Sequence, residues 1–372
     1  MAISSAFRVA NASALACAAV SILSLQTTAP AHAQANAIEQ FYAGKQIRFI
    51  IRSKAGGGYD QYSRLLGRHI GKHIPGKPTI VPVNMPGGGG IIAANYVANL
   101  APKDGTILTI VSQGLPIDQA LGLNKTLKAD MRDFQWIGNL SASNQLLVVW
   151  HTSPTKTLED AKKRETTIGA TGAGSVSTQM PALLNNALGT RLKVIYGYGD
   201  GGDINIAMER GELEGRSTNP WASYRSVTPH YVERKMIIPL IQIGLRKAPE
   251  LPNVPLLLEQ PVSAQDRPAI EFMSKAVMTG RPIATAPGTP AERVTALRRA
   301  FDAALKDPDF LTDAQRMRAE IEPMGGEELA TLVRDIVTAP PEVIARVKQL
   351  IQARSGEAER AKGLPGSKPA QE

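Results

Sequence analysis

The chain has 372 residues, enough for two domains, and its 43% hydrophobic and 20% charged content is typical of a soluble globular protein. A formal net charge of +9 would allow binding to nucleic acid or to a membrane surface. The basic residues are scattered, however, with no run longer than 162–164 and no interleaved aromatic residues, so we expect no nucleic-acid partner.

The N-terminal segment has the pattern of an export signal. An early arginine precedes an apolar stretch at 12–25, and Ala29-Pro-Ala-His-Ala33 offers an Ala-x-Ala cleavage site. The apolar stretch is too short to span a membrane. We therefore predict a signal peptide at 1–33, cleaved near Ala33. The only cysteine, Cys17, lies inside it, so the mature chain has no disulfide.

Strands and helices then alternate in the order expected for a parallel sheet covered by helices on both faces. The predicted strands of a first unit lie at 47–51, 79–83 and 106–111. A second unit has predicted strands at 146–150, 167–170, 192–196, 213–216 and 237–243. Helices are predicted at 59–73 and 91–100 in the first unit, and ending at 188 and 210 in the second.

Beyond residue 249 helices predominate. A proline-containing connector at 251–255 leads into predicted helices at 264–276, 290–306, 308–319, 326–338 and 341–353. A strand predicted at 283–285 could rejoin the first sheet. The tail from Ser355 is polar and contains glycine and proline, which predicts disorder.

Four glycine-containing loops stand where a strand ends and a helix begins, at 53–60, 84–91, 171–177 and 197–203. Glycine permits positive φ and leaves backbone N–H groups open, and a helix N-terminus carries partial positive charge, so such a loop can bind an anion. Ligands of these sheets lie outside the carboxyl ends of the strands. If the two halves face each other, the loops form one anion-binding cleft, although each alone could be a tight turn.

Charged and aromatic side chains accompany these loops. Four basic residues could pair with a carboxylate or remain surface charges: Arg52, Lys54, Arg216 and Arg225. Three aromatic residues could line a ligand pocket or pack in the core: Tyr59, Tyr198 and Trp221.

Motifs of enzymes are missing from the sequence. Gly172-x-Gly174-x-x-Ser177 lacks the third glycine of a dinucleotide fingerprint, and the Walker, G-x-S-x-G and H-E-x-x-H patterns are absent. His69 and His73 have a spacing that can chelate a metal, but no third ligand is evident, which favours packing or solvation. We expect no catalytic residue, metal or cofactor.

Several motifs occur in a fixed order along the mature chain: Ala55-Gly-Gly-Gly-x-Asp60, Asn84-Met-Pro-Gly-Gly-Gly89, Ala101-Pro-Lys-Asp-Gly-Thr106, Gly172-Ala-Gly-Ser175, Met208-Glu-Arg-Gly-Glu-Leu-Glu-Gly215, Leu251-Pro-Asn-Val-Pro255, Ala286-Pro-Gly-Thr-Pro290 and Lys306-Asp-Pro308. In this order they resemble the tripartite tricarboxylate transporter receptors, the Bug-type periplasmic solute-binding proteins. The resemblance covers nearly the whole mature chain.

The resemblance implies a two-lobed, type II-like periplasmic-binding-protein clamshell of the α/β class, each lobe a doubly wound, mostly parallel sheet flanked by helices. The expected divisions are lobe one at 34–140 and 256–354, lobe two at 141–255, and a disordered tail at 355–372. It further implies a monomeric, non-enzymatic periplasmic receptor that binds a small carboxylate and delivers it to membrane subunits of a tripartite transporter.

Together, the loop pattern and the resemblance predict the ligand-binding residues Ala55, Gly56, Gly57, Gly58, Tyr59, Asp60, Gly87, Gly88, Gly89, Gly172, Gly174, Ser175, Tyr198, Asp200 and Trp221. Two departures touch this site. Arg52-Ser-Lys54 stands where the family commonly has Pro-Phe-Pro, and 198–202 replaces a common Lys-Gly pattern. The family's usual ligands therefore do not carry over directly.

Two facing anion-binding lobes favour a dicarboxylate. Two other functions remain open from sequence: a ligand-sensing partner of a membrane sensor kinase, and a secreted hydrolase.

Overall fold

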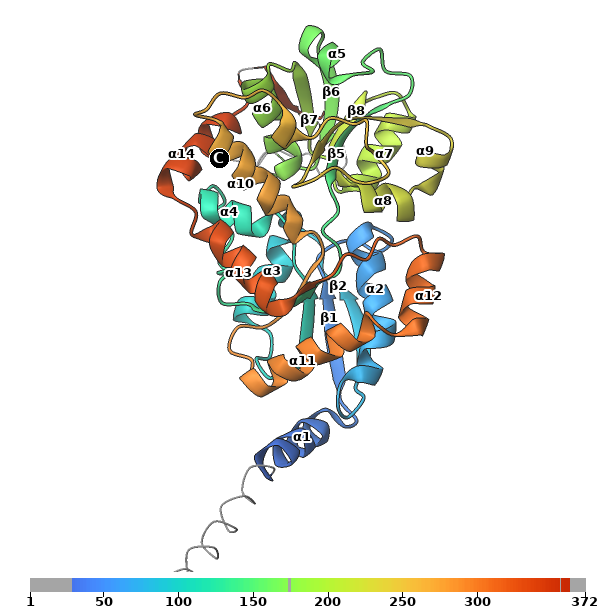
Figure 1. Ribbon diagram of the computed structural model, residues 1–372, viewed down its shortest axis with the longest axis vertical. Coiled ribbons are helices and arrows are strands. Elements are labelled where there is room, and N and C mark those ends of the chain that lie inside the picture. Colours follow the sequence, from blue (N-terminus) through green and yellow to red (C-terminus); the bar gives the residue numbers. More distant parts are fainter. Residues whose placement is uncertain (1–28, 173–174, 355, 362–372) are drawn as a thin grey trace, which may run out of the picture.

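The computed structural model describes residues 29–172, 175–354 and 356–361, and the chain forms two lobes, one above the other in Figure 1. Most of the predicted signal peptide, 1–28, lies outside the described residues. The remaining part, including Ala33, falls within helix α1 (Ala29–Tyr42), which extends from the end of the first lobe (Figure 1).

The first lobe is built on a six-stranded sheet of order β11-β4-β10-β3-β1-β2. Its strands are β1 (Gln46–Ile51), β2 (Thr79–Asn84), β3 (Ile107–Ile110), β4 (Gln135–Asn139), β10 (Pro282–Thr285) and β11 (Met324–Gly325). β1 pairs in parallel with β2 and β3, whereas β10 lies antiparallel between β3 and β4. The prediction that a strand near 283 rejoins the first sheet is confirmed.

Helices cover both faces of this sheet. They are α2 (Gly58–Ile70), α3 (Ile91–Asn99), α11 (Ala291–Ala304), α12 (Pro308–Arg316) and α13 (Gly326–Val337), with the short helices η1 (Gly71–His73) and η2 (Gly88–Gly90). α2, α11 and α12 share one apolar core, and α3 and α13 another. In α2, Tyr62, Leu65, Leu66 and Ile70 recur at helical spacing and are fully buried, because together they form the stripe that faces the sheet.

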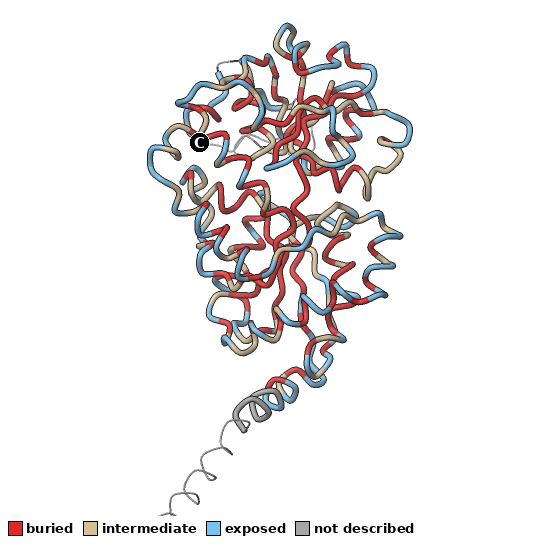
Figure 2. The backbone as a smooth tube through the Cα atoms, viewed as in Figure 1, coloured by how far each residue is buried: buried red, intermediate tan, exposed pale blue. Residues whose placement is uncertain are grey.

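The second lobe has a six-stranded sheet of order β12-β7-β6-β8-β5-β9. Its strands are β5 (Gln145–Trp150), β6 (Thr166–Ala170), β7 (Leu192–Tyr196), β8 (Gly215–Pro220), β9 (Ile237–Ile243) and β12 (Ala358–Arg360). Only β5 is antiparallel to its neighbours. Strands β1, β2, β3 and β4 of the first sheet run in one direction, as do all strands but β5 in the second, so both sheets are rich in parallel strands; helices cover both faces, which confirms the predicted fold class. In Figure 2 the buried backbone follows these strands through both lobes.

The helices of the second lobe come from three parts of the chain. They are α5 (Leu158–Lys163), α6 (Val176–Leu188), α7 (Gly201–Glu209), α8 (Trp221–Ser226) and α9 (Pro229–Glu233), joined by α4 (Leu115–Leu121), α10 (Arg267–Ala276) and α14 (Pro341–Leu350). Two more short helices, η3 (Leu257–Glu259) and η4 (Val277–Thr279), flank α10. Apolar residues of α4, α10 and α14 pack with β5, β6 and β9 in one core. This packing differs from the predicted division, which placed these helices in lobe one, so the lobe boundaries stay a proposal.

The predicted disorder from Ser355 onward is wrong for residues 358–360. These residues form β12, which pairs in parallel with β7, and Ala361 N–H donates to the Tyr196 carbonyl at 2.7 Å. Lys193 and Glu359 add an ion pair across the two strands at 3.4 Å. The polar tail becomes a strand because β7 would otherwise be an edge with unpaired backbone groups. Residues 355 and 362–372 lie outside the described residues.

Candidate functional site

The first glycine loop ends in the uncapped start of helix α2. Gly56 adopts φ +86°, a conformation that favours glycine. Gly57 is the N-cap residue, with φ −78° and ψ 167°, and no side chain caps the helix there. The N–H groups of the first turn and the helix dipole are therefore open to an anion that approaches the loop.

Asp60 holds this loop in place. Its side chain is buried, 3% exposed, and accepts hydrogen bonds from Gly56 N–H at 2.9 Å, Arg64 Nε at 2.9 Å and Asn84 Nδ2 at 2.8 Å. Burial alone would raise the pKa of Asp60, but these three donors outweigh it and lower that pKa. Because the Asp60 carboxylate already accepts three hydrogen bonds and its charge would repel an anionic ligand, the geometry favours a structural role for it.

Two arginines flank Tyr59 at the start of α2. The Cζ atom of Arg52 lies 4.6 Å from the centre of the Tyr59 ring, and that of Arg281 lies 4.5 Å from it. The Tyr59 hydroxyl accepts a hydrogen bond from Gln113 N–H at 3.2 Å. Burial would raise the pKa of Tyr59, yet the two positive charges and this hydrogen bond lower it. Tyr59 thus lies between two cations, and its predicted contact with a ligand stays a prediction.

Neither arginine has an acidic partner. Within the described part of the chain, no carboxylate forms an ion pair with Arg52 or Arg281, and the Nε of each is buried without a hydrogen-bond partner. Arg281 is only 4% exposed. Because a buried charge without a counterion costs several kcal/mol, about 3–5 kcal/mol where a partner has been removed, the Arg281 guanidinium provides a strong attraction for an anion, to which the partly buried Arg52 adds.

The second loop brings its glycines next to Arg52. Gly87 to Gly90 all have positive φ, which only glycine adopts readily. A Cβ atom on Gly90 would lie 3.0 Å from Arg52 Nε, so a side chain there would displace the guanidinium. The predicted residues 87–89 therefore lie beside the first loop, on the same lobe.

The third loop lies at the start of α6 in the second lobe. Ser175 is its N-cap residue but makes no capping bond; its hydroxyl donates to the Gly172 carbonyl at 2.8 Å. Thr178 Oγ1 donates to the same carbonyl at 2.6 Å. These hydroxyls hold the loop backbone in shape and leave the helix start without a side-chain cap. The predicted contact Gly174 lies outside the described residues.

The fourth loop contains residues that serve the fold. Asp200 caps α7, accepting hydrogen bonds from Gly202 N–H at 2.8 Å and Asp203 N–H at 3.2 Å. Tyr198 is buried in the core formed with α7, α8 and α9. Asp200 occupies the helix start that an anion would otherwise use. The geometry gives both residues structural roles.

Trp221 begins α8 and is 6% exposed. Its ring packs in the same core as Tyr198, and its indole N–H finds no hydrogen-bond acceptor among the described residues. A buried indole N–H of this kind can donate to a ligand, and ligand contact by Trp221 stays a prediction.

Contacts across the two lobes bring the loops together. Arg281 Nη2, at the start of β10, donates to Ser223 Oγ of α8 at 2.8 Å. A Cβ atom on Gly199 of the fourth loop would lie 3.4 Å from Nζ of Lys54, beside the first loop. Within the second lobe, a Cβ atom on Gly114, which precedes α4, would lie 3.0 Å from Val176 at the start of α6. The first and fourth glycine loops therefore meet between the lobes.

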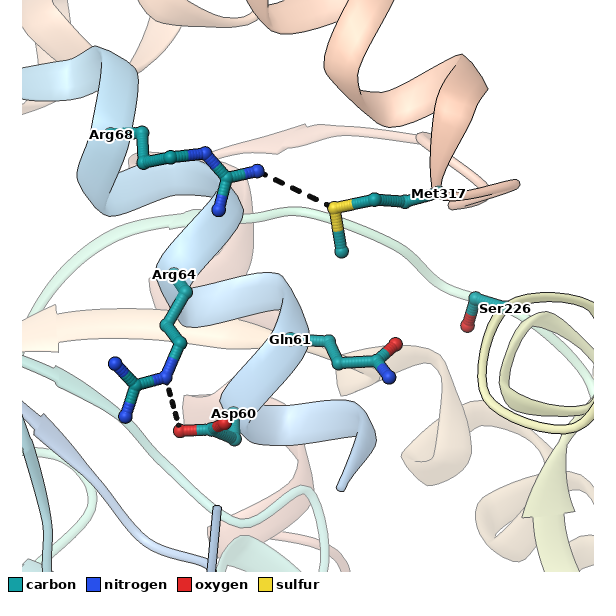
Figure 3. A pocket seen from close by; sticks show the side chains of 6 residues that line it. All are labelled: Asp60, Gln61, Arg64, Arg68, Ser226 and Met317. Carbon is teal, nitrogen blue, oxygen red and sulfur yellow. Dashed lines mark hydrogen bonds and ion pairs between the residues drawn. The ribbon is translucent and has the colours of Figure 1, made fainter. Parts of the chain in front are cut away.

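A pocket of about 280 Å³ opens at the edge of this interface, between α2 and α8. Figure 3 shows its lining, Asp60, Gln61, Arg64, Arg68, Ser226 and Met317. Arg64 turns to Asp60, and Arg68 reaches Met317 Sδ at 3.5 Å. The outer mouth of the interface is therefore lined by basic side chains of α2.

The other basic candidates differ from Arg52 and Arg281. Arg216 Nη1 donates to Gly201 O at 3.0 Å and Asn205 Oδ1 at 2.8 Å, and burial lowers its pKa. Arg225 pairs with Glu250 at 2.5 Å and is partly exposed. Arg216 therefore fastens α7 to β8, and Arg225 already has its counterion.

The two histidines of α2 and η1 each lie against an aspartate of α12 or of its N-cap. His69 Nε2 lies 2.9 Å from Asp313 Oδ2, and His73 Nε2 lies 2.7 Å from Asp307 Oδ2. No cluster of three or more metal-ligating side chains occurs in the portions of the chain described. The two histidines join α2 to α12.

Arg281 and Ser223 were missed by sequence reasoning. Arg281 lies 222 residues from Tyr59 in the chain (281 − 59 = 222), within a segment that carries no motif. One signal could have placed Arg281 near the loops. Arg281 shortly precedes the strand predicted at 283–285, which was expected to rejoin the first sheet.

A two-lobed α/β fold with loops of both lobes meeting at arginines without acidic partners is suited to binding an anionic solute. The chain belongs to the tripartite tricarboxylate transporter receptor family, whose model matches residues 64–355. Members are periplasmic solute-binding receptors and not enzymes, as the sequence predicted. In the described residues, no helix is both long and apolar enough to cross a bilayer.

Individual proteins and solved structures are similar to the chain over most of its length. A Cupriavidus necator protein, "UPF0065 protein in gbd 5'region", is 26% identical over 324 residues, 86% of this chain and 91% of its own. A Rhodopseudomonas palustris protein solved with bound malate has a TM-score of 0.64 at 20% identity, covering 83% of this chain and 99% of its own. An R. palustris protein solved with adipate also has a TM-score of 0.64, at 21% identity, covering 82% and 97%.

Proposed function

We propose that the protein captures a small organic carboxylate, preferentially a dicarboxylate, between its lobes and delivers it to the membrane subunits of a tripartite transporter. The proposal includes export to the periplasm after cleavage of the signal peptide near Ala33, and action as a monomer. The observation that carries it is the pair Arg52 and Arg281, two guanidinium groups without counterions at the uncapped start of α2.

An ionised carboxylate fits this position better than a neutral solute. It would accept from backbone N–H groups of the first loop and from a guanidinium Nε that otherwise lacks a partner. The uncapped start of α6 faces from the other lobe and could take a second acidic group, while α7 is already capped by Asp200. Relatives of the same fold bind the dicarboxylates malate and adipate, which supports the proposal.

The experiment is a thermal-shift and calorimetric screen of residues 34–372 against malate, adipate and other mono- and dicarboxylates, with the matching diamides as neutral controls. A dicarboxylate at about 100 times its Kd should stabilise the protein by about 2.7 kcal/mol. Absence of stabilisation by every carboxylate, or equal stabilisation by a diamide, would refute the proposal.

A substitution at Gly57 locates the binding site. Its φ of −78° suits any residue, and an added Cβ atom would lie no closer than 3.9 Å to its neighbours, so Gly57→Val should fold. The valine methyl groups would stand in front of the N–H groups and abolish the ligand-induced shift. Gly325→Val is the matched control, because Gly325 caps α13 with φ −67° and ψ 160° in open space.

A further inference from the structure

Arg281 occupies the junction of the two lobes. Its backbone N–H donates to Asn139 Oδ1 at 2.7 Å and to the Ser141 carbonyl at 3.1 Å, so it is tied to the chain that leads from β4 to β5. The preceding Gly280 adopts φ +36°, and a Cβ atom there would lie 1.8 Å from the Ser141 oxygen. The base of the Arg281 side chain is thus held where the chain passes between lobes.

The guanidinium group of Arg281 contacts both lobes at once. On the first lobe it lies over the rings of Tyr59 and Tyr62, at 4.5 and 5.3 Å from their centres. On the second lobe its only hydrogen-bond partner in the described chain is Ser223 Oγ, at 2.8 Å. A Cβ atom on Gly58 would lie 2.9 Å from both Arg281 Nη2 and Ser223 Oγ, so this contact lies directly at the start of α2.

Acidic side chains near this point do not neutralise Arg281. Glu320 bonds to the Tyr62 hydroxyl through its backbone, while its carboxyl accepts from Ser143 Oγ at 3.2 Å. Burial raises the pKa of Glu320, with a further contribution from Glu322. Glu320 therefore does not pair with Arg281, and no other carboxylate in the described residues does.

We propose that Arg281 makes closure of the lobes conditional on an anion in the cleft, and so discriminates carboxylates from neutral isosteres. When the lobes separate, Ser223 leaves and water can solvate the guanidinium. When they close without an anion, the charge is desolvated with no acidic partner, compensated only by one neutral hydroxyl and the faces of two tyrosine rings, which is unfavourable. A bound carboxylate removes that penalty. The ligand class in this proposal rests on the proposed function, whereas the effect of the Arg281 charge on closure does not depend on it.

The test measures lobe separation with two labels. The mature segment 34–372 contains no cysteine, so Thr312→Cys on α12 and Arg234→Cys at the end of α9 provide unique sites. Both positions are exposed, and they lie on the same side of the two lobes (Figure 1). Distance distributions are recorded by electron–electron resonance or single-molecule fluorescence, without additive and with malate, adipate or their diamides.

Arg281→Met should raise the closed-to-open ratio without ligand by about tenfold or more, because it removes the buried charge. The same variant should lose at least about tenfold in affinity for a dicarboxylate and lose preference over the diamide. Arg281→Lys keeps the charge and should retain the open population without ligand. Ser223→Ala should reduce closure with ligand, while leaving the preference for anions intact.

The inference is overturned if Arg281→Met leaves the ligand-free distances unchanged, or if the parent protein is as closed without an anion as with one. If no carboxylate closes the parent protein, yet Arg281→Met closes without ligand, the ligand class of the proposed function fails and the role of Arg281 stands. Circular dichroism and the melting temperature of each variant verify that it is folded.

Discussion

Replacing Asp60 with asparagine should weaken the fold of the first lobe at neutral pH. The carboxylate serves three donors, Gly56 N–H, Arg64 Nε and Asn84 Nδ2, at 2.8–2.9 Å. Asparagine has one acceptor oxygen, so its NH₂ group must face at least one of these donors. A hydrogen bond to a charged group contributes about 1.5–3 kcal/mol, and an unsatisfied buried donor costs a similar amount. We expect a loss of about 2–4 kcal/mol in the free energy of unfolding.

The pH dependence distinguishes this mechanism from a general loss of stability. The folded-state pKa of Asp60 is below its unfolded value, so its contribution is present above about pH 4 and disappears as the pH falls through the folded pKa. Urea unfolding of both proteins should differ at pH 7 and converge in acid. Asp302→Asn, which changes an exposed carboxylate on α11, is the control.

Two outcomes would refute this account of Asp60. An equal loss at pH 7 and at pH 3 would show that the carboxylate charge is not responsible. Unchanged stability with a large loss of dicarboxylate affinity would show that Asp60 contacts the ligand, as the sequence predicted.

Two further substitutions test the fold. Burial raises the pKa of Asp118 in α4 to about 7, so its ionised carboxyl destabilises the folded state increasingly between about pH 4 and 7. Asp118→Asn should therefore raise the free energy of unfolding, measured with urea, by about 1–3 kcal/mol at pH 8 and leave it unchanged at pH 4. No gain at pH 8 would show that the carboxyl titrates normally. Gly138→Ala should cost about 1–3 kcal/mol or more, because a Cβ atom there would lie 2.2 Å from the buried ring of Phe301. An unchanged melting temperature, compared with Gly325→Ala as control, would show that β4 and α11 can move apart to make room for the added methyl group.

Local sequence patterns predicted most of the fold. The alternation of buried strands with helices predicted a helix-covered, mostly parallel sheet in each half but not the order of its strands, and the glycine loops indicated where strands end. The strand β12 escaped prediction because Ala358–Arg360 has no apolar alternation; it forms only because β7 offers an unpaired edge. Neither could sequence show that α10 and α14 pack on the second sheet, since an amphipathic helix does not specify its partner.

The site was predictable in its backbone but less so in its side chains. Gly57 and Ser175 stand at uncapped helix starts, as the loop pattern predicted. Asp200 was predicted as a ligand contact, although an aspartate followed by two glycines before a helix is also a typical N-cap. Arg281 and Ser223 meet across 58 residues of chain, and no local signal connects them.

The pairing of β12 with β7 has a consequence for the order in which the protein is assembled. Ala358 lies 164 residues beyond its partner Val194 (358 − 194 = 164), so this contact has one of the long loop closures that slow folding. Because the chain is synthesised from its N-terminus, the β7 edge stays unpaired until the last part of the chain is available. An unpaired parallel edge can recruit a strand from another molecule. Pairing with β12 therefore protects the β7 edge from aggregation only after the C-terminal residues are available. A chain shortened before residue 358 would leave that edge unpaired.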